Sequence, residues 1–284
     1  MTTNRSVSAA PRPENTPEPH HAVVSDAEDQ TAPDLPPALV VQGAVATITL
    51  RRPACANRLS PADLAHLRTH IDTVNQTESV RVLRLQAVGK YFCSGYDISS
   101  LADPDAASSL VFGQTVDLLE QARPVTVAVV HGGVYGGATD LALACDFRIG
   151  SKHANMFMPA TRLGLHFYPG GLRRYVQRLG LDKAKRLFLT AERLDAKQML
   201  DYGFLTDLAE PDNLAHAVQR LTQTLLEMAP LPLVGVKQHL NLIAQGQFDP
   251  DAIEQNVLKS ERSSDIQEGA RAWKEKRTPN FTGR

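Results

Sequence analysis

The spacing of hydrophobic and polar positions changes along the chain, and the change indicates how it is organised. From Leu39 onward, short apolar runs rich in β-branched residues alternate with stretches in which apolar residues recur every three or four positions. The first pattern predicts buried strands and the second predicts amphipathic helices. The clearest predicted strands cover residues 45–50, 81–87 and 125–130. Strands that alternate with helices are typical of an α/β fold.

The strand pattern fades beyond about Arg173, where helical spacing continues. We therefore divide the folded part of the chain into an α/β core at residues 39–195 and a C-terminal helical region at residues 196–284. The predicted helices of the second half cover residues 183–190, 196–202, 214–228, 233–243 and 252–259.

The first 38 residues have a different composition, because prolines and acidic residues crowd together there and large apolar residues are scarce. Such a segment cannot bury enough surface to offset its chain entropy, so we expect a disordered acidic tail at residues 1–38. The segment has no apolar core of a signal peptide.

Net charge and cysteine content exclude several classes of function. The net charge is −1, which gives no basic excess for nucleic acid or an anionic membrane surface. The three cysteines are widely spaced and lack CxxC or Cys/His spacing, so neither a disulfide framework nor a metal site is expected. These properties predict a soluble, cytoplasmic protein that contacts neither membrane nor nucleic acid.

The strongest candidates for a functional site are two glycine-rich turns, at residues 91–97 and 131–140, each of which follows an apolar strand. If Gly137 begins a helix, its N–H lacks a partner within that helix and lies at the positive end of the helix dipole. In the upstream turn, Gly95 lets the backbone bend close to a ligand, which makes the N–H of Tyr96 a second donor. Two such amides on one oxygen form an oxyanion hole.

Asp140 lies three residues after Gly137 and on the same side of the predicted helix. It is therefore the best-placed acid or base of this site. The alternative is that Asp140 only interacts with the positive helix end.

With these residues in view, the chain resembles the crotonase superfamily, the enoyl-CoA hydratase/isomerase-like proteins, from about Val40 to its C-terminus. The resemblance implies a spiral of β-β-α units and C-terminal helices that build a homotrimer or a hexamer. It also implies an acyl thioester of coenzyme A as substrate, with no further cofactor. The matching segments are residues 57–60 (Asn-Arg-Leu-Ser), 92–98 (Phe-Cys-Ser-Gly-Tyr-Asp-Ile), 136–142 (Gly-Gly-Ala-Thr-Asp-Leu-Ala), 145–146 (Cys-Asp) and 275–281 (Glu-Lys-Arg-Thr-Pro-Asn-Phe).

The same resemblance assigns roles to individual positions. The amides of Tyr96 and Gly137 would donate to the thioester carbonyl. The backbone around Arg58, Ser94 and Ile98 would hold the adenine and the pantetheine of coenzyme A. Lys276 and Phe281 would complete the nucleotide site across a subunit contact.

One departure from the family pattern bears on the reaction. Family hydratases carry a second carboxylate just after a proline, and here Ala160 follows Pro159. Alanine can neither position water nor deliver a proton, so ordinary hydration is not expected. The loop at Tyr168 resembles that of methylmalonyl-CoA decarboxylase, which relies on an oxyanion hole and a tyrosine near this loop.

These observations favour decarboxylation of a carboxyacyl thioester, because losing CO₂ produces an enolate that two backbone amides can hold. Tyr168 or Asp140 would supply the proton, and Arg162 or His166 would orient the substrate carboxylate.

Other functions remain open. Asp140 alone could shuttle a proton in an enoyl-CoA isomerase, or support hydration with one carboxylate. His239 lies where polyketide β-branching decarboxylases carry a histidine, which would imply a substrate on an acyl carrier protein. Finally, the protein could be a non-catalytic scaffold that binds acyl-CoA.

Overall fold

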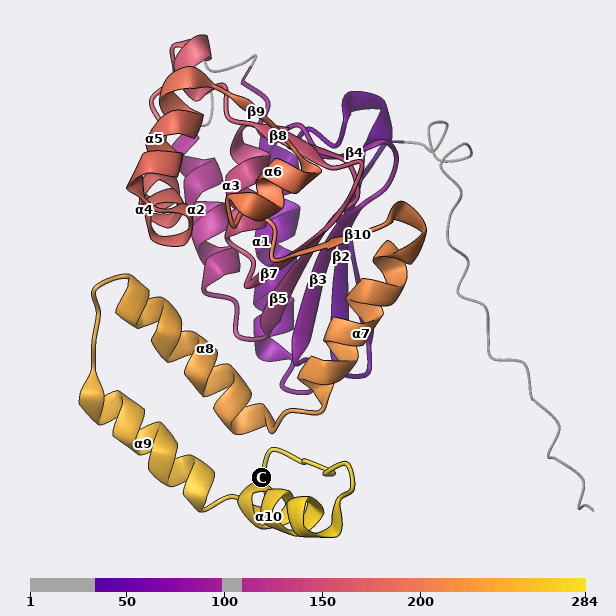
Figure 1. The fold of residues 1–284 in the computed structure, drawn as a ribbon, viewed down its shortest axis with the longest axis vertical. Helices are drawn as coiled ribbons and strands as arrows, with labels where there is room; N and C mark the ends of the chain where they lie inside the picture. The colour runs from indigo at the N-terminus through magenta and orange to yellow at the C-terminus, as the bar shows by residue number, and fades with distance from the viewer. Residues whose placement is uncertain (1–33, 99–108) are drawn as a thin grey trace, which may run out of the picture.

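The computed structural model describes residues 34–98 and 109–284, which form an α/β body from which three helices extend (Figure 1). A six-stranded sheet runs through the body in the order β1-β2-β3-β5-β7-β10. Its strands are parallel except that β1 pairs with β2 in the antiparallel direction. The strands are β1 (Leu35–Gln42), β2 (Val45–Arg51), β3 (Val82–Ala87), β5 (Val125–Val130), β7 (Phe147–Ser151) and β10 (Asp207–Ala209).

A second, smaller sheet has the order β4-β6-β8-β9. Three times, a strand of the large sheet is followed at once by a strand of the small sheet and then by a helical segment. This repeat is the β-β-α spiral that the sequence resemblance implied, so the predicted fold is confirmed. The strands are β4 (Tyr91–Cys93), β6 (Gly133–Tyr135), β8 (Asn155–Phe157) and β9 (Arg193–Asp195).

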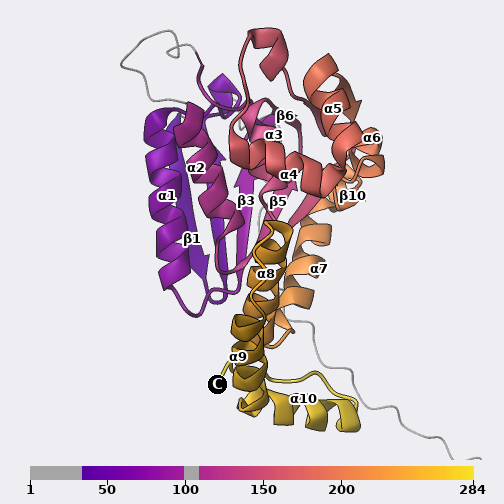
Figure 2. The ribbon, with the colours of Figure 1, turned by 90° about the vertical axis from the view of Figure 1, so that its left-hand side faces the viewer.

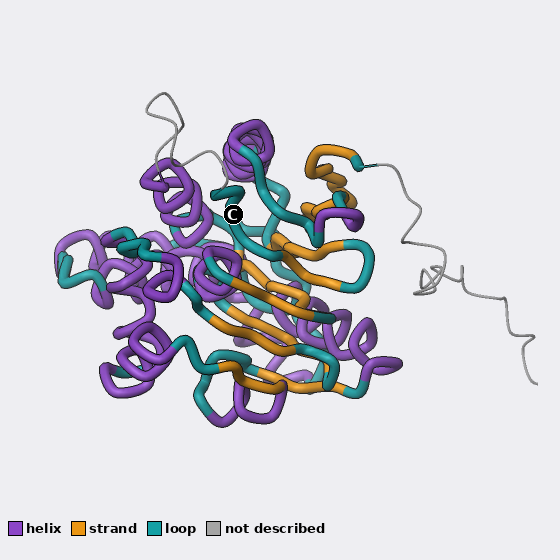
Figure 3. Tube along the Cα trace, turned by 90° about the horizontal axis from the view of Figure 1, so that it is seen from above, coloured by secondary structure: helices purple, strands orange, loops and turns teal. Residues whose placement is uncertain are grey.

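Helices cover both faces of the large sheet, as the side view (Figure 2) and the view from above (Figure 3) show. On one face lie α1 and α2, and on the other lies α7. The apolar side chains between these layers form the two clusters of the core. The helices of the body are α1 (Pro61–Gln76), α2 (Ser109–Glu120), α3 (Gly137–Leu143), α4 (Pro169–Leu179), α5 (Leu181–Thr190), α6 (Ala196–Asp201) and α7 (Leu214–Leu226), with short 3₁₀ turns η2 (Pro53–Cys55), η3 (Ala160–Leu163) and η4 (Pro211–Asn213).

The start of α1 illustrates how local sequence sets an element boundary. The Ser60 side chain accepts from the amide of Asp63, and the Asp63 carboxylate accepts from the amide of Ser60. Pro61 occupies the first helical position, where no N–H is needed. This capping box satisfies two of the orphan amides of the helix.

Most of the predicted N-terminal tail lies outside the described residues, but its last positions belong to the fold. Strand β1 begins at Leu35, and it forms an edge of the large sheet. Pro36 and Pro37 are tolerated because an edge strand does not need every N–H for pairing. Their carbonyls accept from the side chains of Arg51 and His70.

The α/β body also continues past the boundary that we drew after residue 195. Strand β10 pairs with β7 in parallel, and α7 packs against the same sheet. Three-residue strands such as β9 and β10 are too short to show an alternating pattern, so the sequence did not reveal them.

Three helices leave the body beyond α7: α8 (Pro230–Ala244), α9 (Pro250–Glu261) and α10 (Ser264–Glu275) (Figures 1 and 2). Within one chain they expose large apolar side chains, among them Leu240 at 61 % and Trp273 at 88 %. The expected trimer or hexamer stays a prediction. In the part of the chain that the structure describes, none of the helices has the length and apolar character that a bilayer span requires.

Candidate active site

The two glycine turns meet at one place in the fold. A Cβ atom built on Gly95 would lie 3.1 Å from the amide nitrogen of Gly137 and 2.9 Å from the carbonyl oxygen of Tyr135. Gly95 also has φ +97°, a left-handed conformation that favours glycine. The amides of Tyr96 and Gly137 therefore belong to touching turns, and both residues line the same cavity.

Hydrogen bonds to a neighbouring loop hold the Gly95 turn in place. The amide of Leu59 donates to the Gly95 carbonyl at 2.8 Å, and the amide of Asp97 donates to the Leu59 carbonyl at 2.9 Å. The Cys93 thiol lies below the turn, 2.9 Å from the carbonyl oxygen of Asn57. Burial raises the pKa of Cys93 to about 12, so this thiol stays protonated and has a structural role.

The cavity at these turns has a volume of about 440 Å³ and a mainly apolar lining. The two turns, the beginning of α2 and the segment 157–168 enclose it. Among the residues that the sequence singled out, those that line it are Tyr96, Gly137 and Tyr168, together with Arg58, Ser94, Ile98 and His166.

Asp140 does not line the cavity, although its position in the first turn of α3 follows the expectation. Its carboxylate is fully buried and accepts from Arg174, at 2.9 Å from Nε to Oδ1 and 3.1 Å from Nη2 to Oδ2. The Tyr168 hydroxyl donates to Oδ2 at 2.9 Å. The structure thus places Tyr168, and not Asp140, on the cavity wall, with Asp140 behind it.

Arg174 joins several carboxylates into one group, which we call the Arg174 cluster: Asp117 and Glu120 on α2, Asp140 on α3, and Arg173 and Arg174 on α4. Arg174 Nη2 lies 3.0 Å from Asp117 Oδ1, and Nη1 lies 2.6 Å from Glu120 Oε2. Burial raises the pKa of Asp140, and the Arg174 guanidinium opposes that rise. Because Arg174 stays charged and donates to both oxygens, Asp140 is held as its counter-ion.

Tyr168 is the last residue before α4, whose first residue is Pro169. Burial, and then the nearby Asp140, raise the pKa of Tyr168 well above 10, so the hydroxyl is protonated at neutral pH. A glycine on α2 makes room for the ring, because a Cβ on Gly113 would lie 2.6 Å from the Tyr168 ring. Sequence reasoning missed Gly113, since nothing local marks a glycine inside a helix as a packing partner.

Ala160 begins η3 and lines the cavity, so the position of the second family carboxylate holds a methyl group. Within residues 34–98 and 109–284, Asp97 is the one acidic residue of the lining. Its Oδ2 lies 3.7 Å from Arg58 Nε. The described lining therefore lacks the pair of carboxylates that handles water in a hydratase.

Comparisons with known proteins identify the family. Residues 41–284 match the enoyl-CoA hydratase/isomerase family. The chain belongs to this family. It is 30 % identical over 258 residues to the trans-2-decenoyl-[acyl-carrier-protein] isomerase of Streptococcus mutans, covering 86 % of this chain and 97 % of that one. It is 27 % identical over 247 residues to the 2,3-dehydroadipyl-CoA hydratase of Escherichia coli, with 86 % and 97 % covered.

Solved structures agree with this assignment. The crystal structure of an enoyl-CoA hydratase subunit from Geobacillus kaustophilus superimposes with a TM-score of 0.79 at 29 % identity, covering 88 % of this chain and 99 % of that one. The protein is accordingly a crotonase-superfamily enzyme of the hydratase/isomerase type.

The other residues predicted for this hydratase/isomerase-family site lie elsewhere. Arg162 is exposed on η3 and does not line the cavity. His239 on α8 is half-buried and its Nε2 lies 2.8 Å from Asn256 Nδ2 on α9. Lys276 and Phe281 follow α10 and do not line the cavity of their own chain. Their role at a neighbouring subunit remains a prediction.

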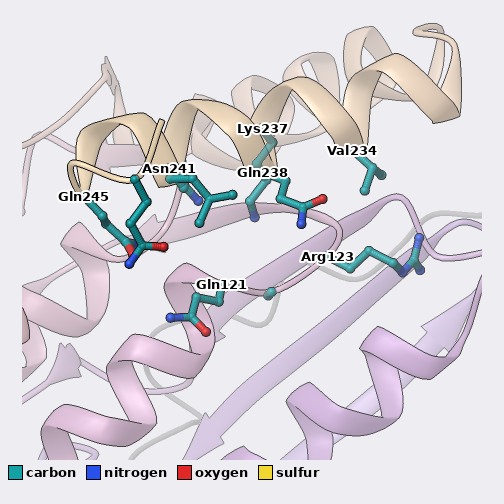
Figure 4. A pocket seen from close by; sticks show the side chains of 10 residues that line it. Gln121, Arg123, Val234, Lys237, Gln238, Asn241 and Gln245 are labelled. Carbon is teal, nitrogen blue, oxygen red and sulfur yellow. The ribbon is translucent and has the colours of Figure 1, made fainter. Parts of the chain in front are cut away.

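A second cavity, of about 450 Å³, lies between α8 and the loop after α2 (Figure 4). Side-chain amides dominate its wall, including Gln121, Asn241 and Gln245. Lys237 lines it, but its ammonium group donates to the Pro124 carbonyl at 2.6 Å and pairs with Asp146 at 2.7 Å. That cation therefore links α8 to the body, and neither of the two glycine turns lines this cavity.

Proposed function

We propose that this enzyme decarboxylates a carboxyacyl thioester, with coenzyme A as the thioester carrier. The observation that carries the proposal is the arrangement of Tyr168, Asp140 and Arg174 beside the two glycine turns. Tyr168 lines the same cavity as Tyr96 and Gly137 and donates its hydroxyl proton to Asp140, whose carboxylate does not line the cavity.

In the proposed reaction the thioester carbonyl accepts from the amides of Tyr96 and Gly137. The bond between Cα and the carboxylate carbon breaks, its electron pair forms the enolate, and CO₂ leaves. The two amides stabilise the negative charge that develops on the carbonyl oxygen. The apolar lining assists, because a carboxylate loses solvation there while the enolate oxygen meets two donors.

The enolate then needs one proton at Cα. Tyr168 supplies it when its O–H turns from Asp140 to the enolate carbon. A proton from solvent then returns to the phenolate, so the substrate carboxylate and one solvent proton give the shorter acyl thioester and CO₂. Arg174 balances the charge of Asp140 behind the phenolate. Hydration is supported less well, because it requires a base for water and Ala160 provides none.

A second candidate is migration of a double bond in an enoyl thioester. The isomerase of Streptococcus mutans, 30 % identical to this chain, favours it. Such a reaction needs one group that removes a proton from one carbon and returns it to another, and the Tyr168–Asp140 hydrogen bond holds such a proton. The name of that relative also makes an acyl carrier protein the alternative carrier.

The test incubates the full chain with methylmalonyl-CoA and its longer alkyl homologues and measures released CO₂ and the acyl-CoA product. We expect both in equal amounts. Enoyl-CoA substrates form a second arm, in which double-bond migration without CO₂ would select the second candidate. A third arm presents the same acyl groups on an acyl carrier protein. Absence of CO₂ from every carboxyacyl thioester would overturn the proposal.

Two variants test whether the Tyr168 hydroxyl supplies the proton that the enolate takes up at Cα. Tyr168→Phe keeps the ring and removes the donor, so kcat should fall by about 10²–10⁴, with the Kd for butyryl-CoA nearly unchanged. The matched control is Tyr175→Phe, which removes another buried phenol that bonds Thr139 and does not line the cavity. A wild-type kcat in Tyr168→Phe would show that this hydroxyl does not carry the proton.

A further inference from the structure

We infer that the acyl group of the substrate carries an aryl ring. The inference takes one point from the proposed function, which is that the thioester carbonyl binds at the amides of Tyr96 and Gly137. The sequence contains nine Phe, six Tyr and one Trp, and more than a third of them gather around the cavity. The aromatic lining residues are Tyr96, Phe112, Tyr135, Phe157, Phe167 and Tyr168.

One group of rings begins at the carbonyl site. The Phe112 ring centre lies 5.7 Å from that of Tyr96 and 6.0 Å from that of Tyr168, and Phe167 stacks on Tyr168 at 4.2 Å. A Cβ on Gly137 would lie 2.8 Å from the Phe112 ring. The aromatic wall is therefore pressed against the turn that holds the carbonyl, where the acyl group must begin.

A second group of rings comes from the small sheet. Tyr135 on β6 and Phe157 on β8 are half-buried neighbours whose ring centres are 5.2 Å apart. The Tyr135 hydroxyl donates to Asn155 at 2.8 Å, and the Arg193 guanidinium lies 4.0 Å above the Phe157 ring. These contacts fix both rings before a ligand arrives.

Aromatic rings prefer offset-stacked or edge-to-face partners with centres about 4.5–7 Å apart. Each such pair adds about two- to tenfold in affinity beyond the area it buries. A saturated acyl group gains only the buried area. Six aromatic rings around one cavity therefore favour an aryl group over an alkyl group of equal size.

The test compares the affinity of the full chain for three acyl-CoA compounds by calorimetry. Phenylacetyl-CoA carries the aryl ring, cyclohexylacetyl-CoA has the same skeleton with a saturated ring, and octanoyl-CoA has the same number of acyl carbons in a straight chain. None of them has a carboxylate to lose, so binding is measured apart from chemistry. We expect phenylacetyl-CoA to bind at least about fivefold more tightly than cyclohexylacetyl-CoA. Equal or weaker binding would overturn the inference.

Substitutions in the cavity wall test which rings cause the preference for an aryl group. Phe112→Leu should reduce the ratio of the two Kd values by about two- to tenfold, and so should Phe157→Leu on the other wall. Phe204→Leu is the matched control, because Phe204 is fully buried and does not line the cavity. It should keep the wild-type ratio. A wild-type ratio in both cavity variants would contradict the inference, and the second variant serves if the first does not fold.

Turnover separates this inference from the proposed function. The rate enhancement, which is kcat divided by the rate constant without enzyme, should be larger for phenylmalonyl-CoA than for methylmalonyl-CoA. Aryl preference in binding without CO₂ from any substrate would refute decarboxylation and leave the aryl site standing. CO₂ from methylmalonyl-CoA without any aryl preference would refute the aryl site and leave decarboxylation standing.

Discussion

The cavity and the Arg174 cluster lie on opposite sides of Tyr168 and have opposite character. The cavity wall is mainly apolar and aromatic. The cluster behind it contains Asp140 and Arg174, both with fully buried side chains, and Glu120, whose side chain is 5 % exposed. The two regions share the Tyr168 hydroxyl, which donates to Asp140.

The difference shows that the presence of a carboxylate at a family position does not fix its use. Asp140 lies on α3 one turn after Gly137, yet Arg174 donates to both of its carboxylate oxygens. A buried ion pair of this kind is held by mutual neutralisation and directed hydrogen bonds. Under the function proposed above, Asp140 positions Tyr168, and the chemistry belongs to the groups that line the cavity.

The largest effect should come from breaking the cluster. Arg174→Ala leaves buried carboxylates without their counter-ion and should lower the free energy of unfolding by about 3–5 kcal/mol, measured by urea denaturation. Arg186→Ala is the control, because Arg186 pairs with Glu192 on the surface and its side chain is 62 % exposed. Because water screens that exposed pair, its loss should lower the free energy of unfolding far less than the loss of Arg174 does. Equal losses in the two variants would show that the cluster is not the stabilising unit described here.

A substitution in the turn beside the cavity should lower kcat more than it lowers the free energy of unfolding. Gly95→Ala forces a Cβ to within 3.1 Å of the Gly137 nitrogen and disturbs the carbonyl site, so kcat should fall by about 10²–10³. Gly43→Ala is the matched control, since Gly43 also has a positive φ of 58° but nothing lies within 4 Å of its Cβ position. It should lose stability and keep its rate. Full activity in Gly95→Ala would remove the oxyanion role of this turn.

Tyr168, which borders both the cavity and the Arg174 cluster, should make the stability of the protein depend on pH. Because the pKa of folded Tyr168 is raised well above 10, the unfolded chain loses this proton first as the pH rises. The contribution of the protonated Tyr168 hydroxyl to the free energy of unfolding is therefore complete below about pH 10 and is lost as the pH rises above it. Unfolding experiments across this range should show a steeper loss of stability in the wild type than in Tyr168→Phe. Identical slopes would place the hydroxyl in a more solvated environment than the structure shows.

The smallest expected effect is on the reactivity of the three cysteine thiols. Burial raises the pKa values of Cys93 and Cys145 to about 12, whereas Cys55 is half-buried. At mildly alkaline pH, a thiol reagent should modify Cys55 in the folded protein and reach the other two only after unfolding. Cys55→Ser should abolish the rapid phase. Rapid labelling of Cys93 would mean that the Gly95 turn opens readily.

Much of the fold was predictable because its signals are local. Ser60, Pro61 and Asp63 lie within four positions and define the start of α1 by themselves. Gly95 and Gly137 each mark a turn that only a small residue fits, and the structure confirms that the two turns touch. Strands β9 and β10 were missed because each has three residues and is stabilised by pairing with distant strands.

The amino-acid sequence by itself determined the alternation of strands and helices, the two glycine turns and the absence of a carboxylate at Ala160, because each depends on residue type or on neighbours within a few positions. The β-β-α spiral was implied by the family resemblance, since its strand order depends on pairing between distant segments. Only the tertiary structure decided that Asp140 is bound to Arg174, 34 positions further on, and that Gly113 admits the Tyr168 ring. These contacts join separate helices, so their geometry exists only after the helices have packed together.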